Sequence, residues 1–353
     1  MRGNFGAITV GKKGVWKKPL SDDDFPYFVR EISALRFLQP HIDGIIRIND
    51  VDGTRINMDR YQGDLSDLIG NIPPQDVYQI TYHVLVVLHN LQKLNLSHRD
   101  IKPHNILYKP GPKSMDLALC DFGLARPNNH TKKQCTPSVQ TQTYRSPELI
   151  FGASDVNYNV LDIWSLGITI LHLFGLYSLL PKDTEHATYK TLYEDLKLPS
   201  EDIMDAGFLE VVKDMLTLDH HKRPEASQLL QHPFFEGFSG PKIITDKEAQ
   251  SILSKLHAAN RPTDPYNAER TAFIESISHL PISDEIRHSS TMLYNKLIAV
   301  NMCITDEVML NIVALSSFLY GEFHFPYDSS VCLDLLKAID YNIVVPLIEP
   351  CLG

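Results

Sequence analysis

The sequence has few cysteines and no excess of positive charge, and each absence excludes a class of protein. The chain of 353 residues contains five cysteines, which lie far apart and form no C-x-x-C pair. Neither a disulfide framework nor a thiolate metal site is therefore indicated. The net charge is −10, whereas nucleic-acid affinity depends largely on lysine and arginine side chains that neutralise phosphates. We expect an intracellular protein of a reducing compartment, cytoplasmic or nuclear, with no nucleic-acid partner.

Long apolar runs are also scarce, and the exception has the features of a buried helix. The first 14 residues contain no apolar stretch of the kind that a signal peptide requires. Residues 160–180 approach the length needed to cross a bilayer. However, Asp162 near the start, His172 in the centre and the lack of a basic flank favour a helix in a protein core. We therefore expect no membrane partner.

The remaining chain has an ordinary globular composition, with 43% apolar and 22% charged residues and no evident repeat. Residues 7–18 predict a β-hairpin with glycines at its corners, and residues 55–58 predict a short strand. Helical spacing is found over residues 28–38, and helical patterns dominate from residue 74 to residue 231. The sequence thus predicts an α+β fold, in which a small mixed lobe precedes a larger, mostly helical lobe.

The stretch SHRDIKPHNIL (97–107) combines three polar groups of different kinds, and Asp121 follows 16 residues after its asparagine. Phosphoryl transfer needs a base that orients the attacking hydroxyl, metal ions across the phosphates and cations for the developing charge. Asp100 can accept the hydroxyl proton, and Lys102 can meet the γ-phosphate. Asn105 together with Asp121 can bind Mg²⁺ through hard oxygen ligands. These residues suit catalysis if the substrate is ATP.

The pattern H-R-D-x-K-x-x-N followed by D-F-G resembles the eukaryotic protein kinases. This resemblance implies a bilobal kinase fold that uses ATP and Mg²⁺. The S-P-E motif that ends at Glu148 resembles the family's A-P-E, which implies an ion pair with Arg223. The D-I-W-S-L-G motif that begins at Asp162 resembles the family's D-x-W-S-x-G, whose aspartate accepts backbone hydrogen bonds from the catalytic loop. Lys102 is the residue typical of serine/threonine kinases.

The nucleotide-binding part of the family is matched less completely. G-N-F-G-A-I supplies only the second and third glycines of G-x-G-x-x-G. Strand alternation favours Lys17 over Lys18 as the ATP lysine, since Val15 would then cover the adenine, and Glu31 should pair with Lys17. The resemblance implies the following ATP-binding residues: Gly3, Gly6, Ile8, Val15, Lys17, Met58 as gatekeeper, Asp59 and Tyr61 of the hinge, and Leu107.

A narrower resemblance is to the cyclin-dependent kinases. F-P-Y-F-V-R-E-I-S resembles their P-S-T-A-I-R-E helix, and T-Y-R-S-P-E-L-I-F-G resembles their W-Y-R-A-P-E-L-L-L-G. In this alignment Thr136 occupies the position of an activating phosphothreonine. The resemblance implies that Arg30, Arg99 and Arg126 would bind its phosphate. A surface threonine with three unrelated arginines is the alternative.

The pattern changes again after residue 241, where a polar connector leads into amphipathic segments. Residues 307–321 are apolar on nearly every side and resemble the middle helix of a cyclin box, and residues 335–346 resemble a second cyclin segment. A generic helical bundle is the alternative. The predicted organisation is a kinase domain at 1–240 (small lobe 1–60, large lobe 61–240), a linker at 241–265 and a helical cyclin-like domain at 266–353.

Together these patterns predict a serine/threonine protein kinase that carries a cyclin-like regulator in the same chain. Its expected partners are protein substrates, while Gln140 and Thr143 leave open whether a proline must follow the phosphorylated residue. One alternative is a pseudokinase scaffold, although the expected catalytic residues are all present. In another, the C-terminal helices are only a docking module. If they instead activate the kinase, Phe28 and Val29 should be buried against them.

Overall fold

The computed structural model describes the chain with several gaps, and the described residues are 2–3, 6–11, 14–111, 114–127, 142–153, 156–176, 198–260, 273–275, 277–278, 280, 284–299, 306–320 and 327–338. The chain divides into two compact units. The first unit comprises Met1–His41, Arg47–Arg60 and Thr245–Gly353, and the second comprises Ile42–Ile46 and Tyr61–Ile244.

The first unit contains an antiparallel sheet with the order β1-β2-β3-β5-β4. Its strands are β1 (Arg2–Gly3), β2 (Gly6–Gly11), β3 (Gly14–Lys18), β4 (Ile48–Asp52) and β5 (Arg55–Met58). The predicted hairpin and the predicted strand at 55–58 are confirmed. Gly14 has a φ of 148°, and a Cβ there would collide with the carbonyl oxygen of Met58. Glycine at this corner therefore permits β3 to pair with β5.

Helix α1 (Phe25–Leu38) follows the hairpin and begins three residues before the predicted start. Proline is favourable in the first turn of a helix because its fixed φ suits that position, and Pro26 lies there. Twelve of the 14 residues of α1 are buried. Burial on nearly every side means that α1 packs against more than one neighbour.

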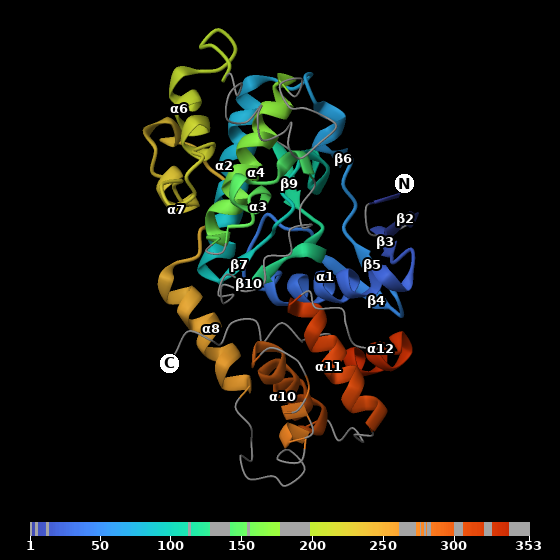
Figure 1. Ribbon diagram of the computed structural model, residues 1–353. Helices are drawn as coiled ribbons and strands as arrows, with labels where there is room; N and C mark the ends of the chain where they lie inside the picture. The colour runs from blue at the N-terminus through green and yellow to red at the C-terminus, as the bar shows by residue number, and fades with distance from the viewer. Residues whose placement is uncertain are drawn as a thin grey trace. The chain divides into compact units, whose positions relative to one another are not determined.

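The C-terminal helices belong to the same unit as the sheet and α1. They are α8 (Asp246–Asn260), α10 (Asp284–Ala299), α11 (Asp306–Tyr320) and α12 (Ser329–Ala338). Helix α11 packs against α10, α12 and α1 (Figure 1). The prediction of a central helix at 307–321 is confirmed, and the small residues Ala314, Ser316 and Ser317 are buried within it.

The segment predicted as a linker at 241–265 differs from the structure, because α8 occupies much of it. The start of α8 is a capping box: the Glu248 backbone N–H donates to Thr245 Oγ1 (3.2 Å), and the Thr245 N–H donates to Glu248 Oε2 (2.7 Å).

Residues 42–46 were predicted to belong to the small lobe, but in the structure they belong to the second unit. There the Ile46 N–H donates to the carbonyl oxygen of Leu119 (2.9 Å).

The second unit is mostly helical around a central helix, α4 (Tyr158–Leu173). Its other helices are α2 (Pro74–Lys93), α3 (Pro147–Ile150), α6 (Ala206–Met215) and α7 (Ala226–Leu229), and its strands are β6 (Gly63–Asp64), β7 (Leu96–Ser97), β8 (Ile106–Pro110), β9 (Met115–Leu119) and β10 (Arg126–Pro127). Helix α4 contacts α2, α6 and α7, which confirms the predicted core helix. In the part of the chain that the structure describes, no helix combines the length and apolar character that a membrane span requires.

Candidate functional site

The loop between β7 and β8 carries the predicted catalytic residues, and a buried carboxylate holds its start. Asp162 of α4 accepts the backbone N–H of His98 at Oδ2 (2.7 Å) and that of Arg99 at Oδ1 (2.8 Å). Burial raises the pKa of Asp162. Arg99 has a φ of 69°, a left-handed conformation that is uncommon for a non-glycine residue. The two hydrogen bonds from Asp162 stabilise this backbone conformation of Arg99. They also confirm the predicted interaction between Asp162 and the catalytic loop.

Three of the predicted site residues meet in this loop. Lys102 Nζ lies 2.6 Å from Asp100 Oδ2, and Asn105 Nδ2 donates to the same oxygen at 2.9 Å. Asn105 Nδ2 also donates to the main-chain oxygen of Asp100 at 2.8 Å. All three side chains are buried. Charge-assisted hydrogen bonds of this kind fix the carboxylate in one orientation.

Asp121 is connected to this loop through the backbone next to it. The Cys120 N–H donates to the carbonyl oxygen of Asn105 at 2.9 Å. Asp121 itself has a φ of 64°, in the left-handed region that aspartate and asparagine adopt more readily than most residues. The structure thus brings the chain positions of Asn105 and Asp121 together, as the sequence predicts.

His98 is a site residue to which the sequence analysis assigned no role. Its Nδ1 accepts the Asp100 backbone N–H at 3.2 Å, so its Nε2 carries the proton that is donated to the Cys120 carbonyl oxygen at 2.9 Å. The Phe122 ring packs edge-on against the imidazole, with centroids 4.7 Å apart. His98 therefore links the H-R-D motif to the D-F-G motif. The sequence already indicated this residue, since His98 is the histidine of H-R-D.

The oxygen ligands of Asn105 and Asp121 suit a hard cation. Because Asn105 uses its amide nitrogen to bind Asp100, its amide oxygen is the atom suited to a metal. Within the described residues, no group of three or more His, Cys, Asp or Glu side chains could hold a metal. Mg²⁺ commonly needs only one or two protein ligands, since water and substrate phosphates complete its shell. The residues therefore fit Mg²⁺, and its binding stays a prediction.

In the first unit, Lys17 of β3 and Glu31 of α1 form the expected ion pair. Lys17 Nζ lies 2.7 Å from Glu31 Oε2, and both side chains are buried. Lys18, the alternative, is exposed. A Cβ at Gly6 would lie 2.8 Å from the Lys18 carbonyl oxygen and 3.1 Å from Lys17 Cγ. The absence of a side chain at Gly6 thus leaves room for the lysine that reaches Glu31.

The other predicted ATP-binding residues are divided between the two units. In the first unit, Val15 lies opposite Met58, which is buried. Ile8 lies opposite Lys17 in the β2–β3 pair. Gly3 lies in β1, and the Asp59 N–H donates to the carbonyl oxygen of Arg47. Tyr61 and Leu107 belong to the second unit. The roles of these residues in ATP binding stay predictions.

The predicted phosphate-binding arginines are also divided. Arg99 and Arg126 are buried in the second unit, where β10 pairs with β7 so that Arg126 lies opposite Ser97. This register brings Arg126 close to the start of the catalytic loop. Arg30 is buried on α1 in the first unit, and Thr136 lies outside the described residues. Within the second unit, the structure therefore places Arg126 beside the strand that leads to Arg99.

The ion pair predicted between Glu148 and Arg223 is confirmed. Arg223 donates from Nη1 to Glu148 Oε1 (2.7 Å) and from Nη2 to Oε2 (3.0 Å), with both side chains fully buried. The guanidinium also lies over the Trp164 ring of α4, 5.0 Å from its centroid. A bidentate ion pair of this kind fixes the relative orientation of the two side chains in addition to neutralising their charges. It holds the S-P-E motif against the helical core.

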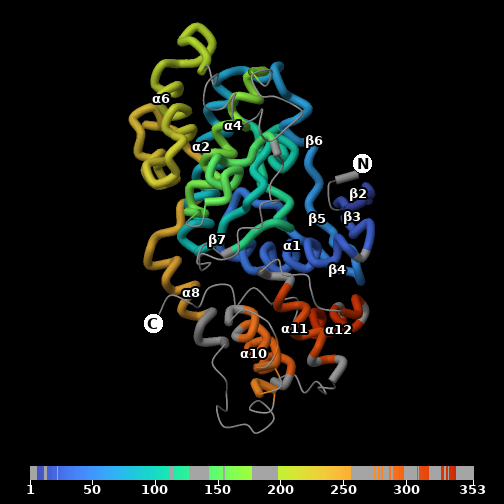
Figure 2. The backbone as a smooth tube through the Cα atoms, viewed as in Figure 1, coloured from blue at the N-terminus to red at the C-terminus, as the bar shows by residue number. Residues whose placement is uncertain are grey.

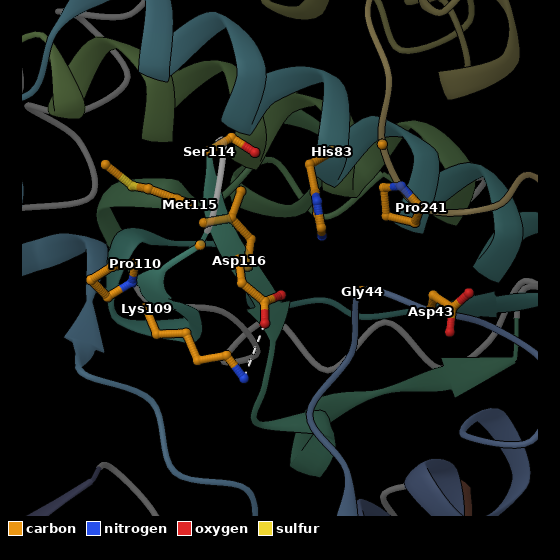
Figure 3. Close-up of a pocket in the computed structure, with 12 residues that line it drawn as sticks. Asp43, Gly44, His83, Lys109, Pro110, Ser114, Met115, Asp116 and Pro241 are labelled. Atoms are coloured by element: carbon orange, nitrogen blue, oxygen red, sulfur yellow. Dashed lines mark ion pairs between the residues drawn. The ribbon is translucent and has the colours of Figure 1, made fainter.

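A cavity of about 710 Å³ lies elsewhere in the second unit, and none of the catalytic-loop residues line it. His83 of α2 points into it, beside an ion pair between Lys109 Nζ and Asp116 Oδ2 (3.0 Å) at the β8–β9 hairpin (Figure 3). Burial lowers the pKa of His83 to about 4, despite the nearby Asp116 carboxylate and the Gly44 carbonyl, which act in the opposite direction. The imidazole is therefore neutral at pH 7.

Acidification should destabilise the fold through His83. The pKa of His83 is about 4 in the fold, whereas a histidine in an unfolded chain titrates near its ordinary value of about 6.5. The unfolded chain therefore binds the extra proton between these values. Stability is lost as the pH falls through this window, by about 2 kcal/mol between pH 7 and pH 5. Urea unfolding at both pH values should give a smaller loss for His83→Gln than for wild type, and an equal loss would contradict this prediction.

Comparisons with known proteins agree with this geometry. Residues 7–235 match the protein kinase domain family. Mitogen-activated protein kinase 3 of Arabidopsis thaliana is 27% identical over 318 residues, which cover 77% of this chain and 77% of that protein. Mitogen-activated protein kinase pmk-3 of Caenorhabditis elegans is 28% identical over 198 residues, 46% of this chain and 41% of that protein.

Cyclin-dependent kinase-like 5 of Mus musculus is 27% identical over 237 residues, which cover 58% of this chain and 24% of that protein. The chain thus spans less than half the length of the Caenorhabditis elegans and mouse relatives. The match to the protein kinase domain nevertheless covers well over half of the chain itself. This protein therefore belongs to the protein kinase family.

Proposed function

We propose that the protein is a serine/threonine protein kinase that transfers the γ-phosphate of ATP to hydroxyl groups of protein substrates. The observation that carries this proposal is the buried cluster of Asp100, Lys102 and Asn105, joined to the chain position of Asp121 by a backbone hydrogen bond. A base, an ammonium and two oxygen ligands are the parts that phosphoryl transfer requires.

In the proposed reaction, Asp100 accepts the proton of the substrate hydroxyl while the hydroxyl oxygen attacks the γ-phosphorus. The bond from the γ-phosphorus to the leaving oxygen of ADP breaks. Lys102 lies 2.6 Å from Asp100 and offers positive charge where negative charge develops on the phosphoryl oxygens. Mg²⁺, held by Asn105 and Asp121, would neutralise phosphate charge when bound.

On the nucleotide side, Lys17 would bind ATP phosphates, and the 2.7 Å pair with Glu31 keeps its ammonium in place. Gly3, Gly6, Ile8, Val15, Met58, Asp59, Tyr61 and Leu107 are proposed to surround the rest of the nucleotide. A pseudokinase usually lacks one of the catalytic residues, whereas Lys17, Glu31, Asp100, Asn105 and Asp121 are all present. Their presence favours an active enzyme over a scaffold.

We further propose that the C-terminal helices form a cyclin-like regulator of this kinase in the same chain. The support is the packing of α11 against α1, the helix that bears Glu31. Val29 and Phe28 of α1 are 0% and 3% exposed. A helix held on this side cannot readily swing Glu31 away from Lys17. A pure docking module would not need to contact α1, so the contact favours the regulatory role.

The direct test is transfer of labelled phosphate from ATP, in Mg²⁺, to serine and threonine peptides with and without a following proline. We expect incorporation into at least one peptide and its loss when Mg²⁺ is chelated, since the phosphates then lose their neutralising cation. The comparison of peptides decides whether proline is required. Absence of incorporation into any peptide or protein substrate would favour the scaffold.

We propose that phosphorylation of Thr136 raises the activity of the kinase. A phosphate there would bring arginines such as Arg99 and Arg126 into charge-assisted hydrogen bonds. Thr136→Ala should therefore lower kcat several-fold without changing the melting temperature, as measured by peptide phosphorylation and thermal unfolding. Thr131→Ala, in the same segment, is the matched control. If Thr136→Ala had the same kcat as wild-type enzyme that is phosphorylated at Thr136, the proposal would be contradicted.

A further inference from the structure

The start of α1 contacts a tyrosine from the other end of the chain, within the first unit. The ring of Tyr327, which lies just before α12, stacks on Phe25, the first residue of α1, with centroids 5.9 Å apart and planes inclined by 16°. Phe25 is only 1% exposed and also stacks on Phe28, at 6.2 Å. Figure 2 shows α11 beside α1, with α12 next to α11. An aromatic stack therefore joins the C-terminal helices to the beginning of α1.

The residue before α1 does not cap the helix with its side chain. The residue that precedes α1, Asp24, makes no side-chain hydrogen bond to the first turn among the described residues. Its carboxylate instead accepts the Leu20 N–H (3.1 Å) and the Ser21 hydroxyl (3.4 Å). A helix without a side-chain cap begins less firmly than one whose orphan N–H groups are satisfied. The aromatic contact is thus one of the side-chain contacts that hold this end of α1.

A buried amide fixes the segment that carries Tyr327. Asn311 of α11 is 3% exposed, and its Oδ1 accepts both the Asp328 backbone N–H (2.8 Å) and the Cys332 thiol (3.2 Å). Burial, together with the Asp328 carboxylate, raises the pKa of Cys332 to about 12, so the thiol stays protonated and can donate. Asp328 Oδ1 in turn accepts the Val331 N–H (3.2 Å) at the start of α12. The backbone next to Tyr327 is therefore held by both α11 and α12.

The distance from this anchor to the catalytic ion pair is short. Glu31 follows Phe25 by six residues, which is about 9 Å along a helix axis at 1.5 Å per residue. Glu31 Oε2 lies 2.7 Å from Lys17 Nζ. A hydrogen bond weakens steeply when its donor angle falls below about 120°. A shift of the start of α1 that misaligns the two groups would therefore weaken this pair.

We infer that Tyr327 is a positioning residue for the kinase reaction, which keeps Glu31 aligned with Lys17 by stacking on Phe25. This inference rests on the proposed function. It assigns the positioning to the aromatic ring of Tyr327 and to the Asn311 amide that holds the adjoining backbone. Tyr327 touches neither substrate nor nucleotide in this role and acts through α1.

The test compares full-length Tyr327→Ala, Tyr327→Phe and Asn311→Ala with wild type. Loss of the stack should lower kcat roughly three- to tenfold in Tyr327→Ala, the effect expected for losing one aromatic pair. Tyr327→Phe keeps the ring and should match wild type, and Asn311→Ala should show an intermediate loss. Asp334→Ala, on the exposed side of α12, is the matched control and should match wild type. The hydrogen-exchange rate of the α1 backbone amides should be higher in Tyr327→Ala than in wild type, and in Tyr327→Phe it should equal the wild-type rate.

The outcomes separate this inference from the proposed function. Equal kcat and equal α1 exchange in Tyr327→Ala and wild type would overturn it, and so would an equal loss in Tyr327→Phe. If Tyr327→Ala does not fold, Tyr327→Leu, which keeps apolar volume, must show the loss of kcat for the inference to stand. If Val29→Glu lowers kcat but Tyr327→Ala does not, regulation through α1 stands and the role of Tyr327 fails. If the wild-type protein transferred no phosphate at all, the kinase assignment itself would be refuted.

Discussion

Asp121→Asn is expected to lower phosphate transfer by roughly 10³-fold or more, since the proposed metal site would lose its only charged protein ligand. The substitution retains the size of the side chain and removes its charge. It also suits the backbone, because Asp121 has a φ of 64° and asparagine adopts left-handed conformations as readily as aspartate. The loss of activity should therefore occur without unfolding. Labelled phosphate transfer and thermal unfolding, measured on the same preparation, check both statements.

A matched substitution distinguishes the role of Asp121 from a general effect of lost charge. Asp214 lies exposed on α6 of the same unit, and Asp214→Asn should keep the wild-type rate. Excess Mg²⁺ should not restore Asp121→Asn, because a neutral amide is a weaker ligand for a hard cation than a carboxylate. If Asp121→Asn were as active as wild type, the kinase assignment of this site would be refuted. If both variants lost activity equally, the effect would not be specific to the metal position.

Reasoning from the residues alone reached the part of the site whose chemistry is local. Asp100, Lys102 and Asn105 lie within six residues, so one turn of chain suffices to bring their side chains together. The Asp162 and Glu148 contacts came from resemblance to a family, since no local pattern links either residue to its partner. Strand alternation favoured Lys17 over Lys18, because neighbouring side chains of a strand point to opposite faces. In the structure Lys17 is the lysine that pairs with Glu31, and its role in ATP binding stays a prediction.

Other features could not be obtained from local patterns. The capping box at Thr245 was present in the sequence, but the polar character of α8 resembles that of a connector. Residues 42–46 join the second unit through backbone hydrogen bonds to β9, and backbone pairing of such a short segment leaves no side-chain signature. Tyr327 is a single aromatic residue whose partner, Phe25, lies near the opposite end of the chain. Contacts of that kind are tertiary, and no periodicity predicts them.

Val29→Glu is expected to lower kcat/KM by roughly ten- to 100-fold, through the packing of α1 against the C-terminal helices. Val29 is fully buried and lies one helical turn after Phe25, so it shares the face that contacts Tyr327. Glu31 lies two residues further on, about 200° around the helix, where it pairs with Lys17. A carboxylate at position 29 would be unpaired among apolar side chains, which costs about 1–3 kcal/mol or more. The helix should relieve this cost by moving away from α11, and Glu31 would move with it.

The matched control for this prediction is Val10→Glu, the same substitution on the same unit. The Val10 side chain is 64% exposed on β2, so the added charge stays in water and activity should be unchanged. Hydrogen exchange of α1 in Val29→Glu should increase, whereas thermal unfolding should show that the protein remains folded. Val29→Ala, which removes packing but adds no charge, should lower activity less. A folded Val29→Glu variant with wild-type kcat/KM would show that α1 does not need this contact, and the C-terminal helices would then be better explained as a docking module.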